Sequence, residues 1–406
     1  MKDAYSEGLA RNWRGIAFAF LKLGLTAYGG PAIMGIMQAE LQERRQWLSK
    51  ARFIDGLSLV NMLPGAGATQ LGIFLGYTRG GWWGGLLAGL CFVLPAFFIM
   101  LALTMGYAAY GATPLMSGAL YGLGPVVMGV FIVALYRLGR SAVTSVPQLM
   151  IGAAAAVGAA LSSVGIVATL ALAGAAGILL FHSRKLGAIG LSVAAALSVV
   201  AQILPWSPVG LVAVAPDGST GQPPGLLDIG SFFFVVGTFS FGGGLTMIAF
   251  IQEQVVNQYH WLTAREFVDG LALGQFTPGP ILMVSAYVGY KLAGVAGAAV
   301  GAAAIFLPSF ILMLSILPAF ERVRKLLWAK AAMKGIGPAV LGVIGVSLVQ
   351  IAPHALPDGF AIVILIGTVT ALLIWRISAI KLMIAGAMAG ALKSRLLSLL
   401  SVREAL

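Results

Sequence analysis

Apolar residues run in long, nearly uninterrupted stretches along the whole chain, and short polar or basic runs separate them. A helix that crosses a bilayer needs about 20 apolar residues, and a window of about 19 residues finds roughly thirteen segments. They lie near residues 16–37, 53–77, 82–106, 114–136, 148–163, 166–182, 186–204, 231–251, 267–290, 294–318, 335–351, 359–375 and 378–396. The pattern predicts an all-α polytopic membrane protein, and several of its segments are short for a full crossing.

Composition agrees with a lipid environment. Hydrophobic residues make up 59% of the 406 residues and charged residues only 9%, whereas an average soluble domain has about 25% charged residues. Such a chain cannot cover a water-facing surface, so we expect the lipid bilayer as its solvent. The formal charge of +12 therefore indicates basic loops and an anionic substrate, not a nucleic-acid partner.

The second part of the chain repeats the first. Leu21–Pro31 matches Phe234–Gly244 at an offset of 213 residues, and Phe53–Leu57 matches Phe267–Leu271 at an offset of 214. Glycine, proline, aspartate and tryptophan match in order, which chance similarity between apolar stretches does not produce. The division that we predict is an N-terminal transporter repeat (1–147), connecting spans with a linker (148–229) and a C-terminal transporter repeat (230–406).

Loop charges predict that the two halves insert with opposite orientation, because Lys and Arg collect in cytoplasmic loops. Residues 107–114 contain neither, whereas the matching loop of the second half contains Arg322, Arg324, Lys325, Lys330 and Lys334. The three connecting segments are odd in number, which also reverses the second half. We therefore expect inverted repeats with a cytoplasmic N-terminus. The basic loop 41–52 fits this scheme if the first two segments of each half are broken or re-entrant.

Inverted-repeat transporters bind substrate at broken helices near the midplane of the membrane. A helix that restarts after a break presents unpaired N–H groups and its positive dipole end, which together bind anions. The alternative is that the glycines only permit close helix packing. The first pair of predicted breaks consists of Tyr28, Gly29, Gly30 and Pro31, and of Ser240, Gly242, Gly243 and Gly244.

A second pair of breaks combines a Pro-Gly step with amide or hydroxyl side chains. We expect these groups to bind a tetrahedral oxyanion, and internal capping of the broken helix is the alternative explanation. The residues are Asn61, Pro64, Gly65, Thr69 and Gln70 in the first half, and Gln275, Thr277, Pro278, Gly279 and Pro280 in the second, with the hydroxyl of Ser285 as a further candidate.

Charged residues inside apolar segments are functional candidates. Lys22 would supply positive charge for the anion, or would extend its side chain to the membrane surface. Glu40 and Glu253 occupy matching positions, as do Asp55 and Asp269. A carboxylate repels a dianion when it is ionised and tolerates it when protonated, so these four residues are candidates for coupling or gating. Helix capping and salt bridges are the alternatives.

Enzyme signatures are missing from the sequence, including the Walker A, H-E-x-x-H and G-x-S-x-G patterns. We therefore predict that the chain is not an enzyme, has no cofactor and no metal site, and transports its substrate on a gradient.

The repeat, the glycine breaks and the run WLTAREFVDGLALGQFTPGPILMVSAYVGY (Trp261 to Tyr290) together resemble the chromate ion transporter (CHR) family in its long two-domain form. One stretch departs from the family pattern: Pro64-Gly65-Ala66-Gly67 stands where members carry Pro-Gly-Pro followed by Glu. The resemblance implies a multi-pass protein of the bacterial inner (plasma) membrane that exports chromate, with sulfate as the related dianion.

Taken with the loop charges, this resemblance predicts a gradient-coupled antiporter that exports chromate in exchange for a counter-ion or a proton. A carrier of sulfate or another oxyanion and a passive anion channel are the alternatives. A homodimer is compatible with the sequence.

Overall fold

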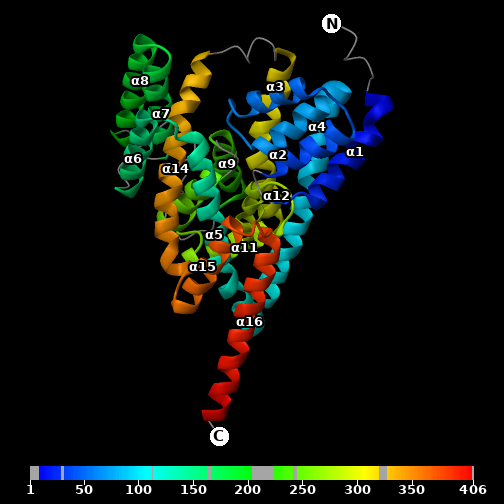
Figure 1. Ribbon diagram of the computed structural model, residues 1–406, viewed down its shortest axis with the longest axis vertical. Coiled ribbons are helices and arrows are strands. Elements are labelled where there is room, and N and C mark those ends of the chain that lie inside the picture. The colour runs from blue at the N-terminus through cyan, green and yellow to red at the C-terminus, as the bar shows by residue number, and fades with distance from the viewer. Residues whose placement is uncertain are drawn as a thin grey trace.

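The computed structural model describes residues 9–28, 32–111, 113–161, 166–203, 224–240, 245–319 and 327–404, which form fifteen α-helices with short π and 3-10 segments (Figure 1). The first half contains α1 (Leu9–Thr26), α2 (Ala32–Met37), η1 (Gln38–Arg44), α3 (Lys50–Val60), α4 (Gly67–Tyr110), α5 (Pro114–Ala142), α6 (Val146–Ala160), α7 (Ile166–Phe181) and α8 (Arg184–Ile203). The second contains α9 (Leu226–Thr238), α10 (Leu245–Gln252), η4 (Glu253–Gln258), α11 (Ala264–Phe276), η5 (Ile281–Met283), α12 (Val284–Ile316), η6 (Leu317–Ala319), α14 (Leu327–Ala355), α15 (Gly359–Leu373) and α16 (Ala379–Glu404).

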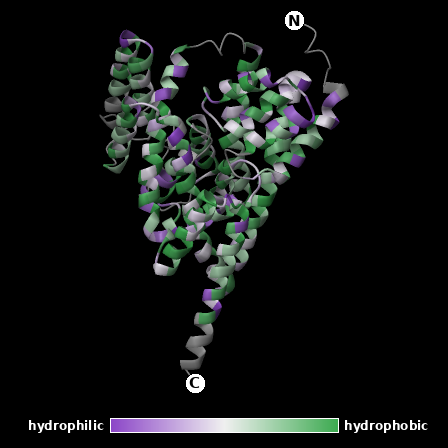
Figure 2. Cartoon of the chain, in the orientation of Figure 1, coloured by the Kyte–Doolittle hydropathy of each residue, from purple (hydrophilic) through white to green (hydrophobic). Residues whose placement is uncertain are grey.

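Four stretches of the described chain are long and apolar enough to cross a membrane: α4, the main part of α5, α14, and α12 with its flanking 3-10 turns. Hydrophobic residues extend along most of the helices, and hydrophilic residues form short stretches, several of them at helix ends (Figure 2). The protein is therefore a multi-pass membrane protein with an all-α fold.

The predicted breaks are real interruptions of the helices. α1 ends at Thr26 and α2 begins at Ala32, while α9 ends at Thr238 and α10 begins at Leu245. The residues Gly29, Gly30, Pro31, Gly242, Gly243 and Gly244 themselves lie outside the described part of the chain. The Pro-Gly steps also separate helices, since residues 61–66 lie between α3 and α4, and residues 277–280 between α11 and η5.

Both α4 and α12 are helical hairpins. Their backbones leave the helical region at Gly80 and Gly81 (φ 64°, ψ −154°) and at Ala293 and Gly294 (φ 59°, ψ −149°). The carbonyl oxygen of Gly84 lies 2.4 Å from the ideal Cβ position of Gly76, although eight residues of straight helix would rise about 12 Å. The backbone of each helix therefore reverses direction at the kink. The apolar segments predicted at 53–77 and 82–106 thus form α3 and two antiparallel arms of α4.

The structural correspondence continues to the last helices. α6 begins at Val146 and α15 at Gly359, and α7 begins at Ile166 and α16 at Ala379. Both differences, 359 − 146 and 379 − 166, equal the 213-residue offset of the sequence repeat. α8 is then the one helix between the two corresponding sets in the described residues.

The two sets of helices interlock. α15 and α16 of the second set pack on α5 of the first, and α6 and α7 of the first set pack on α14 of the second. Small residues let these helices approach closely. The carbonyl oxygen of Gly386 lies 2.0 Å from the ideal Cβ position of Gly122, and the carbonyl oxygen of Ala173 lies 1.9 Å from the ideal Cβ position of Gly335. Because α4 also packs on α12, one continuous core joins both halves.

Candidate functional site

One backbone hydrogen bond connects each Pro-Gly break to the broken helix of the other half. The Gly65 N–H donates to the Ser240 carbonyl (2.5 Å), and the Gly279 N–H donates to the Ala27 carbonyl (2.8 Å). Ala27 and Ser240 are 213 residues apart (240 − 27), the offset of the repeat. The same contact is thus made twice, and the four breaks meet at one place between the repeats.

Glycine is required at both donor positions. Gly65 has φ 132° and Gly279 has φ 94°, a region that residues with a Cβ rarely adopt. A Cβ at Gly65 would lie 2.2 Å from Gln70 Nε2, and a Cβ at Gly279 would lie 2.9 Å from the Cβ of Ala96. The sequence Pro-Gly at each break therefore reflects both backbone conformation and close approach.

A small pocket lies where the breaks meet. Its walls are Ala66, Gly67 and Ala68 at the start of α4, Pro280, Ile281 and Leu282 at the start of η5 and α12, and Ile33 at the start of α2. The cavity measures about 10 Å³, roughly the space of one water molecule. Helix starts from both repeats thus converge on it, and first-turn N–H groups and dipoles favour an anion there.

Four buried oxygens near the breaks lack a hydrogen-bond partner among the described residues: Thr69 Oγ1, Gln70 Oε1, Ser240 Oγ and Ser285 Oγ. All four side chains have 0% exposure. The amide nitrogen of Gln70 donates to the Pro64 carbonyl (2.6 Å). Buried polar groups are normally paired, so a cluster of unpaired ones is a site that a ligand or water can satisfy. All four residues were predicted from the sequence as candidates for binding the anion.

Other predicted residues lie differently. The Thr277 hydroxyl is buried but donates to the Leu273 carbonyl (3.0 Å), which is the internal capping that was the alternative explanation. Asn61 is exposed at the end of α3, and Tyr28 and Gln275 are half-buried.

Ser309 belongs to the site but carries no signal in the sequence. Its fully buried hydroxyl accepts a hydrogen bond from the Ala66 N–H (2.7 Å) and so positions the start of α4. The matching residue of the first half is Ala96. A serine in the middle of an apolar helix is normally explained by a bond to its own helix, and only the contact with a residue 243 positions earlier assigns it here.

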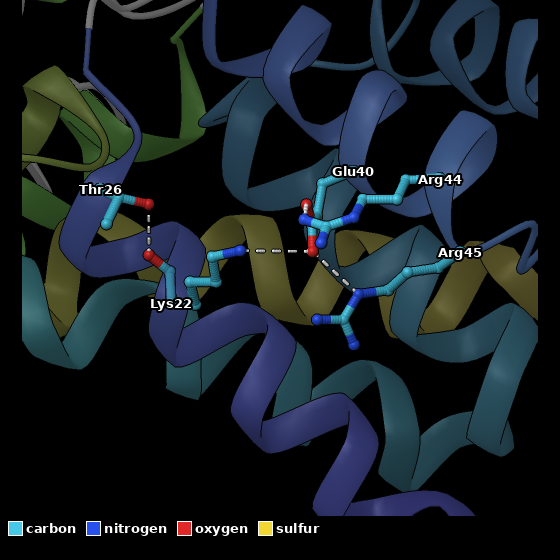
Figure 3. Close-up of polar contacts among 5 residues, drawn as sticks. All are labelled: Lys22, Thr26, Glu40, Arg44 and Arg45. Carbon is cyan, nitrogen blue, oxygen red and sulfur yellow. Dashed lines mark hydrogen bonds and ion pairs between the residues drawn. The ribbon is translucent and has the colours of Figure 1, made fainter.

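A cluster of charged side chains lies where η1 approaches α1 (Figure 3). Glu40 Oε1 lies 3.6 Å from Lys22 Nζ and 2.9 Å from Arg45 Nε, and Glu40 Oε2 lies 3.3 Å from Arg44 Nη1. Three cations thus surround one carboxylate, which leaves a net charge of +2 (three minus one). Lys22 and Arg44 are exposed, so the cluster is open to an incoming anion.

Glu40 is held in its charged form. Burial raises the pKa of its carboxyl, but Arg45, Lys22 and Arg44 lower it by more, so the net pKa lies below the ordinary value. The second half has no such cluster: Val235, Asn257 and Gln258 occupy the positions of Lys22, Arg44 and Arg45. Glu253 is half-buried and accepts a hydrogen bond from Asn257 (2.7 Å). Both glutamates lie in π-helical segments, η1 and η4, which often mark functional sites.

The two aspartates of the repeat also differ. Asp55 on α3 is half-buried, whereas Asp269 on α11 is only 5% exposed. The Asp269 carboxylate accepts a hydrogen bond from the Tyr107 hydroxyl at the end of α4 (3.1 Å). A buried carboxylate and a residue of the other repeat are thus in direct contact.

Comparison with known proteins identifies the family of this chain. The chain matches the "Chromate transporter" family at residues 14–178 and again at 227–391. It is 33% identical over 384 residues to the "Chromate transport protein" of Cupriavidus metallidurans (92% of this chain, 91% of that protein). It is also 32% identical over 371 residues to the "Probable chromate transport protein" of Synechococcus elongatus (88% of each), and 31% identical over 335 residues to the "Chromate transport protein" of Pseudomonas aeruginosa (82% and 79%).

No solved structure matches the chain. Two matched stretches that differ by the repeat offset (227 − 14 and 391 − 178, both 213) account for most of the sequence. The chain therefore belongs to the chromate transporter (CHR) family, and it is a transporter rather than an enzyme.

Proposed function

We propose that this protein is a secondary transporter that exports chromate from the cytoplasm. The observation that carries the proposal is the pocket between the repeats, where helix starts from both halves converge beside unpaired buried oxygens. Three relatives at 31–33% identity are named for chromate transport or probable chromate transport, which supports chromate as the substrate.

The dianion would bind between the start of α4 and the start of η5 and α12. The N–H groups of the first helical turns donate to its oxygens, and the hydroxyl groups of Thr69 and Ser285 complete the cradle. The pocket has room for about one water in this conformation, so the repeats must separate to admit the anion. This is the alternating access that inverted-repeat carriers use.

The cationic cluster around Glu40 would capture the anion first. A dianion that reaches Lys22, Arg44 and Arg45 competes with Glu40 for the same three cations, so Glu40 acts as an internal counter-ion that the substrate displaces. The cluster exists on one half only. If the basic loops are cytoplasmic, it lies at the cytoplasmic mouth, which favours export.

We also propose that the protein lies in a bacterial inner membrane, as the family resemblance implies, with a cytoplasmic N-terminus. Two features support an inverted orientation of its halves. The turn after α4 and the start of α14 belong to matching loops, and they lie toward opposite ends of the molecule in Figure 1. Lys330 and Lys334 belong to the second of these loops, while the predicted Arg322, Arg324 and Lys325 fall outside the described residues. Among the described residues, α8 is the one helix between the corresponding sets, and an odd number of crossings there would reverse the second set.

Reconstitution in proteoliposomes tests the proposal. Purified protein should give chromate flux that saturates with concentration, and sulfate should compete better than phosphate because it shares the charge and shape of chromate. A sulfate carrier would move sulfate but not chromate, and a channel would give flux that does not saturate. Chromate that neither moves nor competes would contradict the proposal.

A matched pair of variants connects the flux to the site. Gly279→Ala forces a side chain into a positive-φ position, at a cost of about 1–3 kcal/mol, and pushes the break away from Ala96 and Ala27. We expect it to lower the chromate flux several-fold. Gly274→Ala, on the preceding helix with open space around its Cβ, should leave the flux unchanged. Equal flux in both variants would remove the break from the transport site.

A further inference from the structure

The contact between Asp269 and Tyr107 joins α11 of the second repeat to α4 of the first. Asp269 Oδ2 accepts the hydrogen bond of the Tyr107 hydroxyl, 3.1 Å away and 162 residues earlier in the chain. Asp269 Oδ1 lies 3.5 Å from Arg265 Nε, yet it has no hydrogen-bond partner among the described residues. The oxygen Oδ1 faces Arg265 but accepts no hydrogen bond from the described residues, so it is the oxygen on which this buried carboxylate can bind a proton.

The surrounding charges are balanced when this carboxylate is ionised. Lys291 Nζ pairs with Glu266 Oε1 (2.8 Å) and lies 5.9 Å from the centre of the Tyr107 ring. The Tyr287 hydroxyl donates to the Glu266 backbone carbonyl (2.9 Å). Two cations, Arg265 and Lys291, thus face two carboxylates, Glu266 and Asp269. Protonation of Asp269 leaves a net charge of +1 in a largely buried contact.

The other helices packed on α11 are α5, α14 and α16. Gly124 of α5 lies near Val268 of α11 and Ala355 of α14, which shows where these helices meet. The titratable residues of these helices near this place are Tyr121 on α5, His354 on α14 and Lys393 on α16. Tyr121 and Lys393 both bind Asp358, and His354 is exposed. The groups that act on the Asp269 carboxyl are Arg265, Tyr107 and Glu266.

The first repeat lacks the same arrangement. Phe74 takes the place of Tyr287, and each ring packs on a matching glycine, Gly56 or Gly270. Asp55, which matches Asp269, is half-buried. Glu40 is surrounded by three cations and remains ionised, and Glu253 is half-buried beside Asn257. Of the four predicted coupling carboxylates, Asp269 is the most buried, and it contacts the other repeat through Tyr107.

We propose that Asp269 is the proton-binding site of the transporter and that its contact with Tyr107 couples proton binding to the movement of the repeats. The proposal rests on the proposed transport function. The ionised carboxylate accepts a charge-assisted bond from Tyr107 and holds the repeats together. One proton added to the carboxylate gives the neutral acid, which weakens that bond and leaves Arg265 uncompensated. The proton shifts the equilibrium between conformations by its different affinity for each of them.

Arg265 marks the exposed side of this contact. Its side chain is 42% exposed, while that of Asp269 is 7% exposed. Asp269 Oδ1 therefore faces the exposed member of the ion pair. A proton from that side can bind the carboxylate without crossing the core.

The test is chromate flux in proteoliposomes with and without a pH gradient. The wild-type flux should rise several-fold under a gradient of one orientation. Asp269→Asn, fixed in a neutral form, should lose this stimulation while it still exchanges chromate for chromate at equal pH. Tyr107→Phe should keep the stimulation and move its pH midpoint upward, because the lost hydrogen bond stabilised the charged carboxylate. Glu43→Gln, which removes an exposed carboxylate, should behave as wild type.

Each outcome decides between the two proposals. A pH-gradient response that survives in Asp269→Asn, or a midpoint that does not move in Tyr107→Phe, overturns the proton site and leaves chromate transport intact. Wild-type chromate flux that does not respond to the pH gradient also overturns the proton site and leaves chromate transport intact. Absence of chromate flux in the wild type contradicts the proposed function and the proton site together. If Asp269→Asn does not fold, the midpoint in Tyr107→Phe decides.

Discussion

At the scale of single residues, the two halves use the same positions for different chemistry. Glu40 and Glu253 match, but only Glu40 lies among cations, because Lys22, Arg44 and Arg45 have uncharged counterparts. Ser309 has Ala96 as its counterpart, and Tyr287 has Phe74. The first half therefore carries a cluster with a net charge of +2 (three cations and one carboxylate), whereas the second half has uncharged residues at the three cationic positions.

Lys22 should govern how well the anion is captured. We expect Lys22→Gln to raise the KM for chromate several-fold at low ionic strength and to change kcat little, because the lysine acts before the anion reaches the pocket. Salt should reduce the difference, since screening acts over about 10 Å at 0.1 M ionic strength. Initial rates of chromate flux at two salt concentrations measure this.

Lys50→Gln is the matched control, because Lys50 is an exposed cation at the start of α3 outside the cluster. It should leave the KM unchanged. An equal increase in both variants would show that general surface charge, and not the Glu40 cluster, attracts the substrate.

At the scale of elements, glycine decides where the long helices reverse. Gly81 and Gly294 adopt nearly the same conformation, with φ near +60° and ψ near −150°, and this region is essentially restricted to glycine. The resulting hairpins place the starts of α4 and α12 near the centre of the interface and let α4 pack on α12. The hairpins thus set the position of the pocket.

Replacement of this glycine should destabilise the protein through the backbone alone. Gly294→Ala meets no atom within 4 Å of its Cβ, so the cost of about 1–3 kcal/mol comes from φ and ψ. Gly367→Ala, also in open space but within the helix α15, should be neutral or slightly stabilising. Thermal unfolding of both variants in detergent measures the difference, and equal Tm values would contradict the role of the kink.

At the scale of the whole molecule, the repeats exchange parts. The helices α15 and α16 of the second set pack on α5 of the first, and α6 and α7 of the first set pack on α14 of the second. Each Pro-Gly break also forms a hydrogen bond with the broken helix of the other half. Neither half has a complete core by itself, since the cluster of buried residues runs through both. Movement of the repeats therefore changes the interface at which the pocket, Ser309 and Asp269 lie.

The orientation of the halves is tested by cysteine labelling. Cys91 is the single cysteine, so Cys91→Ser provides a cysteine-free background. Cysteines introduced singly at Tyr110 and Lys330, both exposed, should react with a membrane-impermeant reagent from opposite sides. Labelling from the same side would exclude inverted repeats and with them the cytoplasmic assignment of the Glu40 cluster.

The sequence by itself determined the membrane class, the 213-residue repeat, the family and the positions of all four breaks. These features are local: glycine and proline restrict the backbone where they stand, and hydrophobicity depends on composition along each segment. Thr69, Gln70 and Ser240 could be predicted because they stand next to a break. Only the tertiary structure decided that Gly65 bonds to Ser240 and Gly279 to Ala27, that Ser309 positions α4, and that Asp269 meets Tyr107. Those contacts join residues far apart in sequence, and packing of the whole interface, not any local preference, brings them together.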